Sequence, residues 1–232
     1  YGIKLPIRTA GEYLKRWGYT PQKPIRKAYE QQPEEVQRWL DKTYPEIEKR
    51  AQKEGAEVQW ADETGLNNTD SRGRGYAPKG RTPTVYGSSK RFSVSMISSL
   101  TNKGQLRFMI YEGGMNAKIF IKFLRRLIKD SPRKVFLIVD NLRSHHAKIV
   151  QQWAEKYKEK IELFFLPPYS PENNPDEYVN QDIKQQMKKK PAPCSKEQLQ
   201  DNLSSYMRSL QRKPNKVKRF FNHEKVQYAK AS

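Results

Sequence analysis

The strongest indication of the fold is the segment Val135-Phe136-Leu137-Ile138-Val139-Asp140. Five consecutive apolar residues, followed at once by an acid, are typical of a short strand that is buried on both faces of a sheet. Such strands occur in parallel sheets, whose strands are joined by crossover helices. We therefore expect a helix-covered sheet, with Asp140 just beyond the end of this strand.

The sequence on either side of this strand predicts further strands and helices. Strands are expected at residues 57–61, 91–100 and 105–111, and Thr101-Asn-Lys-Gly104 between the last two is a hairpin signal. Asn116 can cap a helix that ends near Asp130, a second helix follows around Trp153, and residues 161–166 form another strand. Pro175 then opens a helix toward Lys190. The order β-β-β-α-β-α-β-α indicates an α/β fold with a mixed sheet flanked by helices.

Both ends of the chain are expected to be helical. Thr9-Ala-Gly-Glu12 fits a capping box for a helix that runs to Trp17, and Pro45 divides a second helical stretch. The N-terminal helical part is either the end of a helix-turn-helix module or a helical cap on the next domain. A second capping box, Ser195 with Gln198, opens a C-terminal helix. The predicted domains are a helical segment with a linker at 1–55, a catalytic domain at 56–192 and a basic helical extension at 193–232 that packs on it.

Composition restricts the class of protein. The 232 residues contain 45 Lys and Arg against 25 Asp and Glu, a formal net charge of +20, which points to nucleic acid as the partner. The single cysteine excludes an internal disulfide, and no apolar run reaches the ~20 residues of a membrane span. With no leader pattern, a cytoplasmic protein without a membrane partner is expected. Because the chain opens at Tyr1 rather than Met, we expect a fragment.

Three carboxylates occupy positions where α/β sheets build sites. Asp62 follows the first predicted strand, Asp140 follows the buried strand, and Glu177 lies in the first turn of the helix opened by Pro175. Acids gathered at one sheet edge in so basic a protein favour a divalent cation, and Mg²⁺ prefers oxygen ligands. Two such ions can assist cleavage of a phosphodiester. The alternative is that each acid is a turn former or a helix cap.

The residues around these acids resemble a known family. Ala61-Asp62-Glu63-Thr64-Gly65, the block from Val139 to His146, and the block Leu166-Pro-Pro-Tyr-Ser-Pro-Glu-Asn-Asn-Pro-Asp-Glu177 look like the signature blocks of mariner-like DDE transposases, with the bacterial insertion-sequence-630 family as the best match. The third block is the most specific of the three. The resemblance runs from about Tyr1 to Lys225.

The resemblance implies an RNase H-like catalytic domain in which Asp62, Asp140 and Glu177 bind the metal, Mg²⁺ or Mn²⁺, as two ions. It implies hydrolysis at transposon ends and strand transfer into target DNA, typically at TA, by a homodimer or larger assembly on double-stranded DNA. It also implies a bacterial, nucleoid-associated location. Only a remnant of the helix-turn-helix region that recognises the ends is expected here. Glu177 fits the third position better than Asp176, which suits the helix dipole.

Two basic segments are the expected DNA contacts. The segment 71–91 contains Arg72, Arg74, Lys79 and Arg81 and no acid, and Lys184 and Lys188 lie on the helix after Glu177. Phosphate contacts of this kind position DNA without reading its sequence. His145 and His146 are interpreted as caps of the following helix.

Two other functions remain compatible with the sequence. One is an RNase H-like nuclease that hydrolyses without strand transfer. The other is a nonenzymatic DNA-binding protein derived from a transposase.

Overall fold

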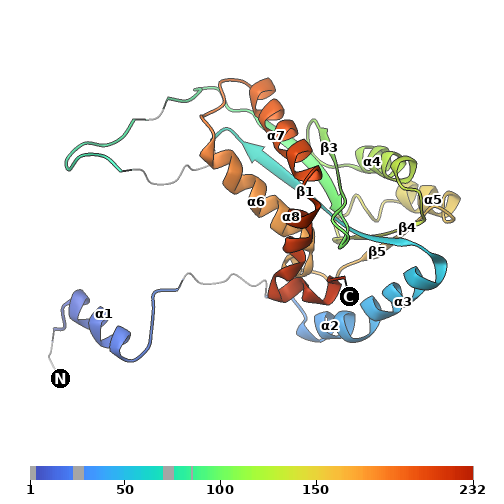
Figure 1. The fold of residues 1–232 in the computed structure, drawn as a ribbon, viewed down its shortest axis with the longest axis horizontal. Helices are drawn as coiled ribbons and strands as arrows, with labels where there is room; N and C mark the ends of the chain where they lie inside the picture. Colours follow the sequence, from blue (N-terminus) through green and yellow to red (C-terminus); the bar gives the residue numbers. More distant parts are fainter. Residues whose placement is uncertain (1–3, 23–28, 70–75, 85, 232) are drawn as a thin grey trace. The chain divides into compact units, whose positions relative to one another are not determined.

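The computed structural model describes residues 4–22, 29–69, 76–84 and 86–231. The chain forms two compact units, residues 1–31 and residues 32–232 (Figure 1). The first unit contains helix α1 (Ile7–Arg16), which ends before Gly18 at φ +83°. No helix among the described residues has both the length and the apolar character needed to cross a membrane.

The second unit is built on one five-stranded mixed sheet. Its strands are β1 (Glu57–Asn67), β2 (Ser93–Leu100), β3 (Leu106–Tyr111), β4 (Val135–Val139) and β5 (Ile161–Phe165), in the order β3-β2-β1-β4-β5. β1, β2 and β3 pair antiparallel, whereas β1, β4 and β5 pair parallel. The predicted mixed α/β sheet is confirmed, and every residue of β4 is buried.

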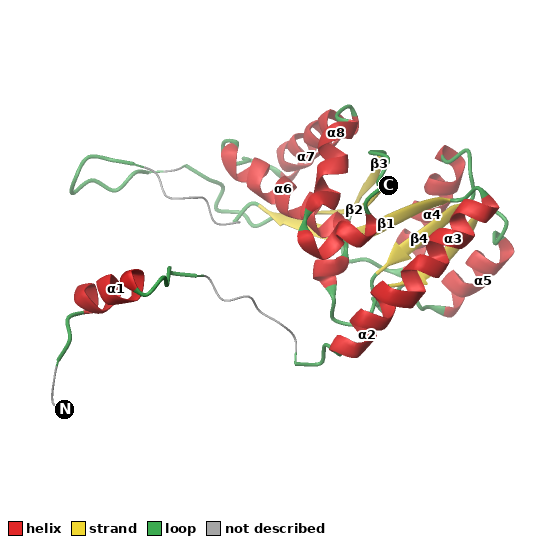
Figure 2. Cartoon of the chain, turned by 60° about the horizontal axis from the view of Figure 1, so that its bottom comes forward, coloured by secondary structure: helices red, strands yellow, loops and turns green. Residues whose placement is uncertain are grey.

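Helices cover both faces of this sheet (Figures 1 and 2). One face packs on α4 (Ala117–Asp130) and α5 (Lys148–Lys156), through Phe120, Phe123, Leu124 and Trp153. The other face packs on α3 (Tyr44–Glu54), α6 (Pro175–Lys189), α7 (Lys196–Gln211) and α8 (Pro214–Arg219), with the 3-10 helices η3 (Phe220–Asn222) and η4 (Glu224–Ala229). Successive side chains of a strand alternate between these two cores, as the pleat requires.

The helices of the second unit that precede β1 form one run. α2 (Pro33–Arg38) continues through a π-helical segment, η1 (Trp39–Thr43), into α3. Pro45, at the start of α3, has no N–H to bond the preceding turn, and the run changes there from π-helix to α-helix without ending. Trp39, Tyr44, Ile47 and Ala51 are buried against the sheet.

The predicted N-terminal capping box is wrong. Helix α1 begins at Ile7, two residues before Thr9, and has no side-chain cap. The Ala10 N–H already donates to the Pro6 carbonyl at 3.0 Å, so the helix is under way where the box was placed.

The second capping box is present with one change of partner. Ser195 Oγ accepts from the Gln198 N–H at 3.2 Å, while Gln198 Oε1 accepts from the N–H of Cys194 at 2.6 Å rather than from that of Ser195. Asn116 caps α4 as expected, because its Oδ1 accepts from the N–H groups of Lys118 and Ile119.

Candidate active site

Asp62 lies within β1, not after it as the sequence suggested. The strand continues to Asn67 because β2 pairs with it along this whole length, with Asp62 opposite Ser98. The parallel register on the other side aligns Trp60 with Ile138. Two residues further along each strand are Asp62 and Asp140, so the two acids reach the same level at the carboxyl end of β4.

Asp62 and Asp140 line one cavity of about 460 Å³. The rest of its wall is formed by Asn141, Leu142, Asn174 and the turn from Leu166 to Pro171. Tyr169, in this turn, has φ +56°, a backbone conformation that non-glycine residues rarely adopt. The predicted meeting of these two acids at the rim of the sheet is therefore present in the structure.

Glu177 joins the site through Asp62. It lies in the first turn of α6, after the N-cap residue Asn174, whose Oδ1 accepts from the Asp176 N–H at 3.0 Å. The Asn174 amide also donates to the Ala61 carbonyl at 3.0 Å, which ties the start of α6 to β1. As a result the carboxyl of Glu177 lies within hydrogen-bonding reach of Asp62.

The environment of Asp62 opposes its ionisation. Burial first, and then the negative charges of Asp176, Glu63 and Glu177, raise the pKa of the Asp62 carboxyl well above its usual range. The Asn180 amide donates to Asp62 Oδ2 at 2.9 Å. Among the described residues, no lysine or arginine forms an ion pair with Asp62 or Glu177. A cation at this position would offset the repulsion and favour the ionised carboxylates, so the donor set fits a divalent metal.

Asp176 has a structural place that sequence reasoning missed. Its side chain is fully buried, accepts from Ser98 Oγ at 2.9 and 3.0 Å, and accepts from the Asp62 N–H at 3.0 Å. Burial raises the pKa of Asp176 well above its usual range. The helix-dipole interpretation was therefore incomplete: Asp176 joins α6 to β1 and β2. No local signal could reveal this, because Ser98 is 78 residues away.

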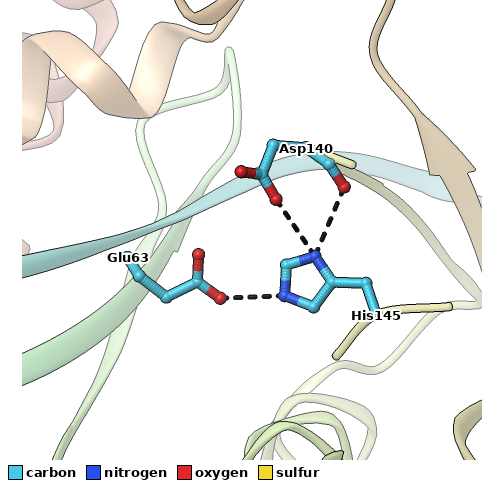
Figure 3. A group of neighbouring side chains, drawn as sticks. All are labelled: Glu63, Asp140 and His145. Carbon is cyan, nitrogen blue, oxygen red and sulfur yellow. Dashed lines mark hydrogen bonds and ion pairs between the residues drawn. The ribbon is translucent and has the colours of Figure 1, made fainter. Parts of the chain in front are cut away.

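His145 is the second site residue that the sequence misassigned (Figure 3). It is 2% exposed, and the next helix, α5, has Ala147 at its N-cap with no side-chain cap. Instead, its Nδ1 lies 3.1 Å from Asp140 Oδ1 and its Nε2 lies 2.9 Å from Glu63 Oε1. Glu63, next to Asp62 on β1, points to the opposite face of the sheet, so His145 links β1 to the end of β4.

The electrostatics of this bridge favour a protonated imidazole. Burial alone would lower the pKa of His145, but the hydrogen bonds and charges of Asp140 and Glu63 raise it to about 9. Burial would likewise raise the pKa of Asp140, yet the hydrogen bonds from His145 and from the Leu142 N–H lower it. At neutral pH both ring nitrogens therefore donate, and Asp140 stays ionised.

The atoms of Glu63, Asp140 and His145 also lie within 4.8 Å of one another, close enough to surround an ion. Each of the three residues contributes one of these atoms, so His145 takes part through a single ring nitrogen. The ring bridges two carboxylates through opposite nitrogens, so this trio forms an acid–histidine–acid link beside the cavity.

The predicted DNA-contacting residues lie in three places. Arg72 and Arg74 lie outside the described residues. Lys79 and Arg81 are exposed in the segment between β1 and β2. Lys184 and Lys188 are exposed on α6, while Val179 and Ile183 of the same helix are buried.

Comparison with known proteins gives matches for both parts of the chain. Residues 57–200 match the family described as DDE superfamily endonuclease, and residues 1–43 match a winged helix-turn helix family. No curated protein matches the chain.

The fold is similar to that of solved Mos1 structures. The Mos1 strand transfer complex matches with a TM-score of 0.63 and 17% identity, over 97% of this chain and 70% of that chain. The mariner Mos1 paired end complex with Mg matches with a TM-score of 0.64 and 17% identity, over 97% and 71%. The catalytic domain of Mos1 mariner transposase gives 0.52 and 15%, over 92% and 100%.

These likenesses confirm the RNase H-like arrangement of the sheet. The family match spans most of the chain and contains all three predicted acids together with Asp176 and His145. The chain belongs to the DDE superfamily endonuclease family.

Proposed function

We propose that this chain is the catalytic part of a DNA transposase of the mariner-like type, within the insertion-sequence-630 family. It hydrolyses a phosphodiester at each transposon end and then transfers the freed strand into target DNA, at TA. The observation that supports the proposal best is the cavity that Asp62 and Asp140 line together. Glu177 lies close to Asp62, whose surroundings disfavour its own charge.

Asp62, Asp140 and Glu177 would hold the metal, as two ions. When bound, Mg²⁺ or Mn²⁺ would activate the attacking oxygen and stabilise the charge on the leaving oxygen. Solved structures of the Mos1 paired end complex with Mg and with Mn support this choice. Glu177, partly exposed, is available as a ligand, whereas the oxygens of Asp176 already accept from Ser98 and from the Asp62 N–H.

The residues around the acids hold them in place. Asn180 fixes Oδ2 of Asp62, and Asp176 fixes its backbone. His145 and the Leu142 N–H fix Oδ1 of Asp140, which leaves Oδ2 free of both of these contacts. Preorganised carboxylates need little rearrangement when charge develops in the transition state.

Neither step of the proposed reaction changes an oxidation state, so no redox partner is needed. In hydrolysis, a water oxygen bonds to phosphorus, the bond to the 3′ oxygen breaks, and that oxygen takes up a proton as a 3′-hydroxyl. In strand transfer, this hydroxyl oxygen bonds to a target phosphorus and displaces another 3′ oxygen, which takes the proton.

Double-stranded DNA is the proposed partner, bound by a homodimer or larger assembly. The winged helix-turn helix match at residues 1–43 supports DNA binding by the N-terminal part of the chain. Arg72, Arg74, Lys79, Arg81, Lys184 and Lys188 are the proposed phosphate contacts. We place the protein in the bacterial cytoplasm, associated with the nucleoid.

The test replaces one acid at a time. Asp62→Asn, Asp140→Asn and Glu177→Gln should each lower Mg²⁺-dependent cleavage of a transposon-end duplex by on the order of 10³-fold, since a bound metal contributes several kcal/mol. Asp201→Asn, an exposed acid on α7, is the matched control and should keep full activity. If Asp140→Asn left every DNA activity unchanged, a nonenzymatic DNA-binding protein would replace the proposal.

A precut transposon end separates transposase from nuclease. Incubation of this end with supercoiled target DNA and Mn²⁺ should give joined product. Cutting without joining would assign the chain to hydrolysis alone.

A further inference from the structure

The outer face of α4 carries an unbroken row of cations. Lys118, Lys122, Arg125, Arg126 and Lys129 are all exposed, at spacings that place them within about 100° of the helix circumference. The opposite side of the helix, including Phe120 and Leu124, is buried in the core. We call these five residues the α4 basic row. None of the predicted DNA contacts lies in it.

The α4 basic row is electrostatically unfavourable in the isolated chain. Like charges three and four residues apart repel one another along a helix. Lys118 also lies in the first turn, which holds no acid, where the helix dipole disfavours a cation. Within the described residues, none of the five forms an ion pair. A polyanion on this face would remove the repulsion.

A groove beside α4 adds further donors. α4 and α7 both pack against the edge strand β3 (Figure 1), and the groove between them has a volume of about 360 Å³. Arg126 lines it from α4, and Arg208 lines it from α7. Arg107 also lines it but is bonded to Glu57 at 3.1 Å, and Asp130 is the acidic residue of the wall. Positive charge therefore exceeds negative charge in this groove.

The α4 basic row starts near the carboxylate rim and leads away from it. Phe120, one turn into α4, contacts the ring of His145 with centroids 4.1 Å apart, and His145 bonds Asp140. At the far end, the Asp130 carbonyl accepts from Arg107, whose other partner, Glu57, begins β1. The row thus follows the sheet from the end that carries the acids to the opposite end.

The geometry points to double-stranded DNA as the occupant, held through its phosphates. Lys129 lies eleven positions after Lys118, a rise of about 16 Å, which equals the axial length of about five base pairs of duplex DNA. On α4, which is described throughout its length, no aromatic residue is exposed, so base stacking has no platform there. We propose that the α4 basic row and Arg208 form a sequence-independent track for the duplex that continues away from the reacting phosphodiester.

This inference rests on the proposed function for its link to the reaction, but binding can be tested without chemistry. The variant Lys122→Gln, Arg125→Gln, Arg126→Gln removes three charges from the track. The matched control Lys49→Gln, Lys53→Gln, Lys160→Gln removes three exposed charges elsewhere. The dissociation constant for a labelled duplex of arbitrary sequence is measured by fluorescence anisotropy over a range of salt concentrations, in EDTA.

At low salt, the track variant should bind the labelled duplex about tenfold more weakly than the wild type, or weaker still. The plot of log affinity against log salt concentration should be less steep by about 0.9 for each phosphate that the variant no longer neutralises. The control should bind like the wild type. In a separate assay with Mg²⁺, the track variant should lose less cleavage of a short duplex that ends at the rim than of a long duplex that reaches the track. If the wild type bound the duplex but did not cleave it, the proposed function would be refuted, while the DNA track would still be supported.

Equal loss of affinity in the two triple variants would show that net charge alone acts and would overturn the inference. So would unchanged DNA affinity in the track variant. If, in addition, that variant lost binding to anionic lipid vesicles, the row would be assigned to a membrane surface.

Discussion

Among single residues, His145 controls the orientation of Asp140 most directly. Replacing it by alanine leaves Oδ1 of Asp140 and Oε1 of Glu63 without their shared donor. We expect His145→Ala to raise the Mg²⁺ concentration needed for half-maximal cleavage, or to lower kcat, by about 10–100-fold, as loss of a partner of a metal ligand does. DNA affinity should not change. His223→Gln, an exposed histidine, is the control, and an unaltered Mg²⁺ requirement in His145→Ala would contradict the positioning role.

Asp176 and Glu177 are neighbours with different expected phenotypes. Asp176→Ala would leave Ser98 Oγ and the Asp62 N–H buried without an acceptor, so the free energy of unfolding should fall by about 1–3 kcal/mol for each group. Asp176→Asn keeps an acceptor oxygen and should cost less. Glu177→Gln should lose activity and keep its stability. Urea denaturation followed by fluorescence distinguishes these outcomes, and a stable Asp176→Ala would refute the structural role.

The raised pKa of Asp62 makes a pH-dependent prediction. The pKa of the Asp62 carboxyl is higher in the folded protein than in the unfolded chain, where it is near 4. Such a carboxyl destabilises the fold increasingly as the pH rises from the unfolded pKa to the folded pKa. Without metal, Asp62→Asn should therefore gain stability relative to the wild type between pH 4 and neutrality. Mg²⁺ should reverse the order at neutral pH. Melting temperatures across this range, with and without Mg²⁺, test the sign, and a difference independent of pH would contradict it.

Among the elements, the hairpin between β2 and β3 depends on its contact with α8. Gly104 has φ +90°, and a Cβ there would lie 2.6 Å from the Pro214 carbonyl oxygen. Gly104→Ala should therefore cost more than the ~1–2 kcal/mol of a left-handed alanine, because the backbone of α8 must also shift. Gly55→Ala is the matched control, since Gly55 has φ +63° with no atom within 4 Å of the added Cβ. If Gly104→Ala and Gly55→Ala lowered the free energy of unfolding equally, the contact between the hairpin and α8 would be shown to be unimportant.

For the whole molecule, the C-terminal helices belong to the core of the second unit. Leu203, Met207, Val217 and Phe221 are buried in the same cluster as Trp60. Each such side chain contributes about 1.5–3 kcal/mol, and a domain has only ~5–15 kcal/mol of net stability. A chain ending at residue 194 should therefore show no cooperative thermal transition. A chain beginning at Gln32 should melt like the full chain, because residues 1–31 form a separate unit. Circular dichroism checks both, and a cooperative transition in the first chain would contradict the argument.

Local patterns in the sequence predict the strands, the helices between them and their order. The apolar run 135–139, the hairpin signal at 101–104 and the caps Asn116 and Ser195 act over a few residues, so local patterns are sufficient to predict them. The two acids Asp62 and Asp140 could be placed at one rim because parallel strands bring their carboxyl ends together. The Thr9 capping box failed because an N-cap signal also occurs inside helices, and Pro6 started α1 earlier.

The partners of those acids depend on contacts between distant parts of the chain, which the sequence does not reveal. That Asp62 lies within β1 depends on its long pairing with β2. The burial of Asp176 against Ser98 and the bridge from Glu63 through His145 to Asp140 join residues 78 and 82 positions apart. Such contacts arise from how the sheet and helices pack, and pKa values follow from the resulting burial and charge. The row of cations on α4 can be read from its spacing, but its outward direction and its course from the acidic rim became visible only once the helix was docked on the sheet.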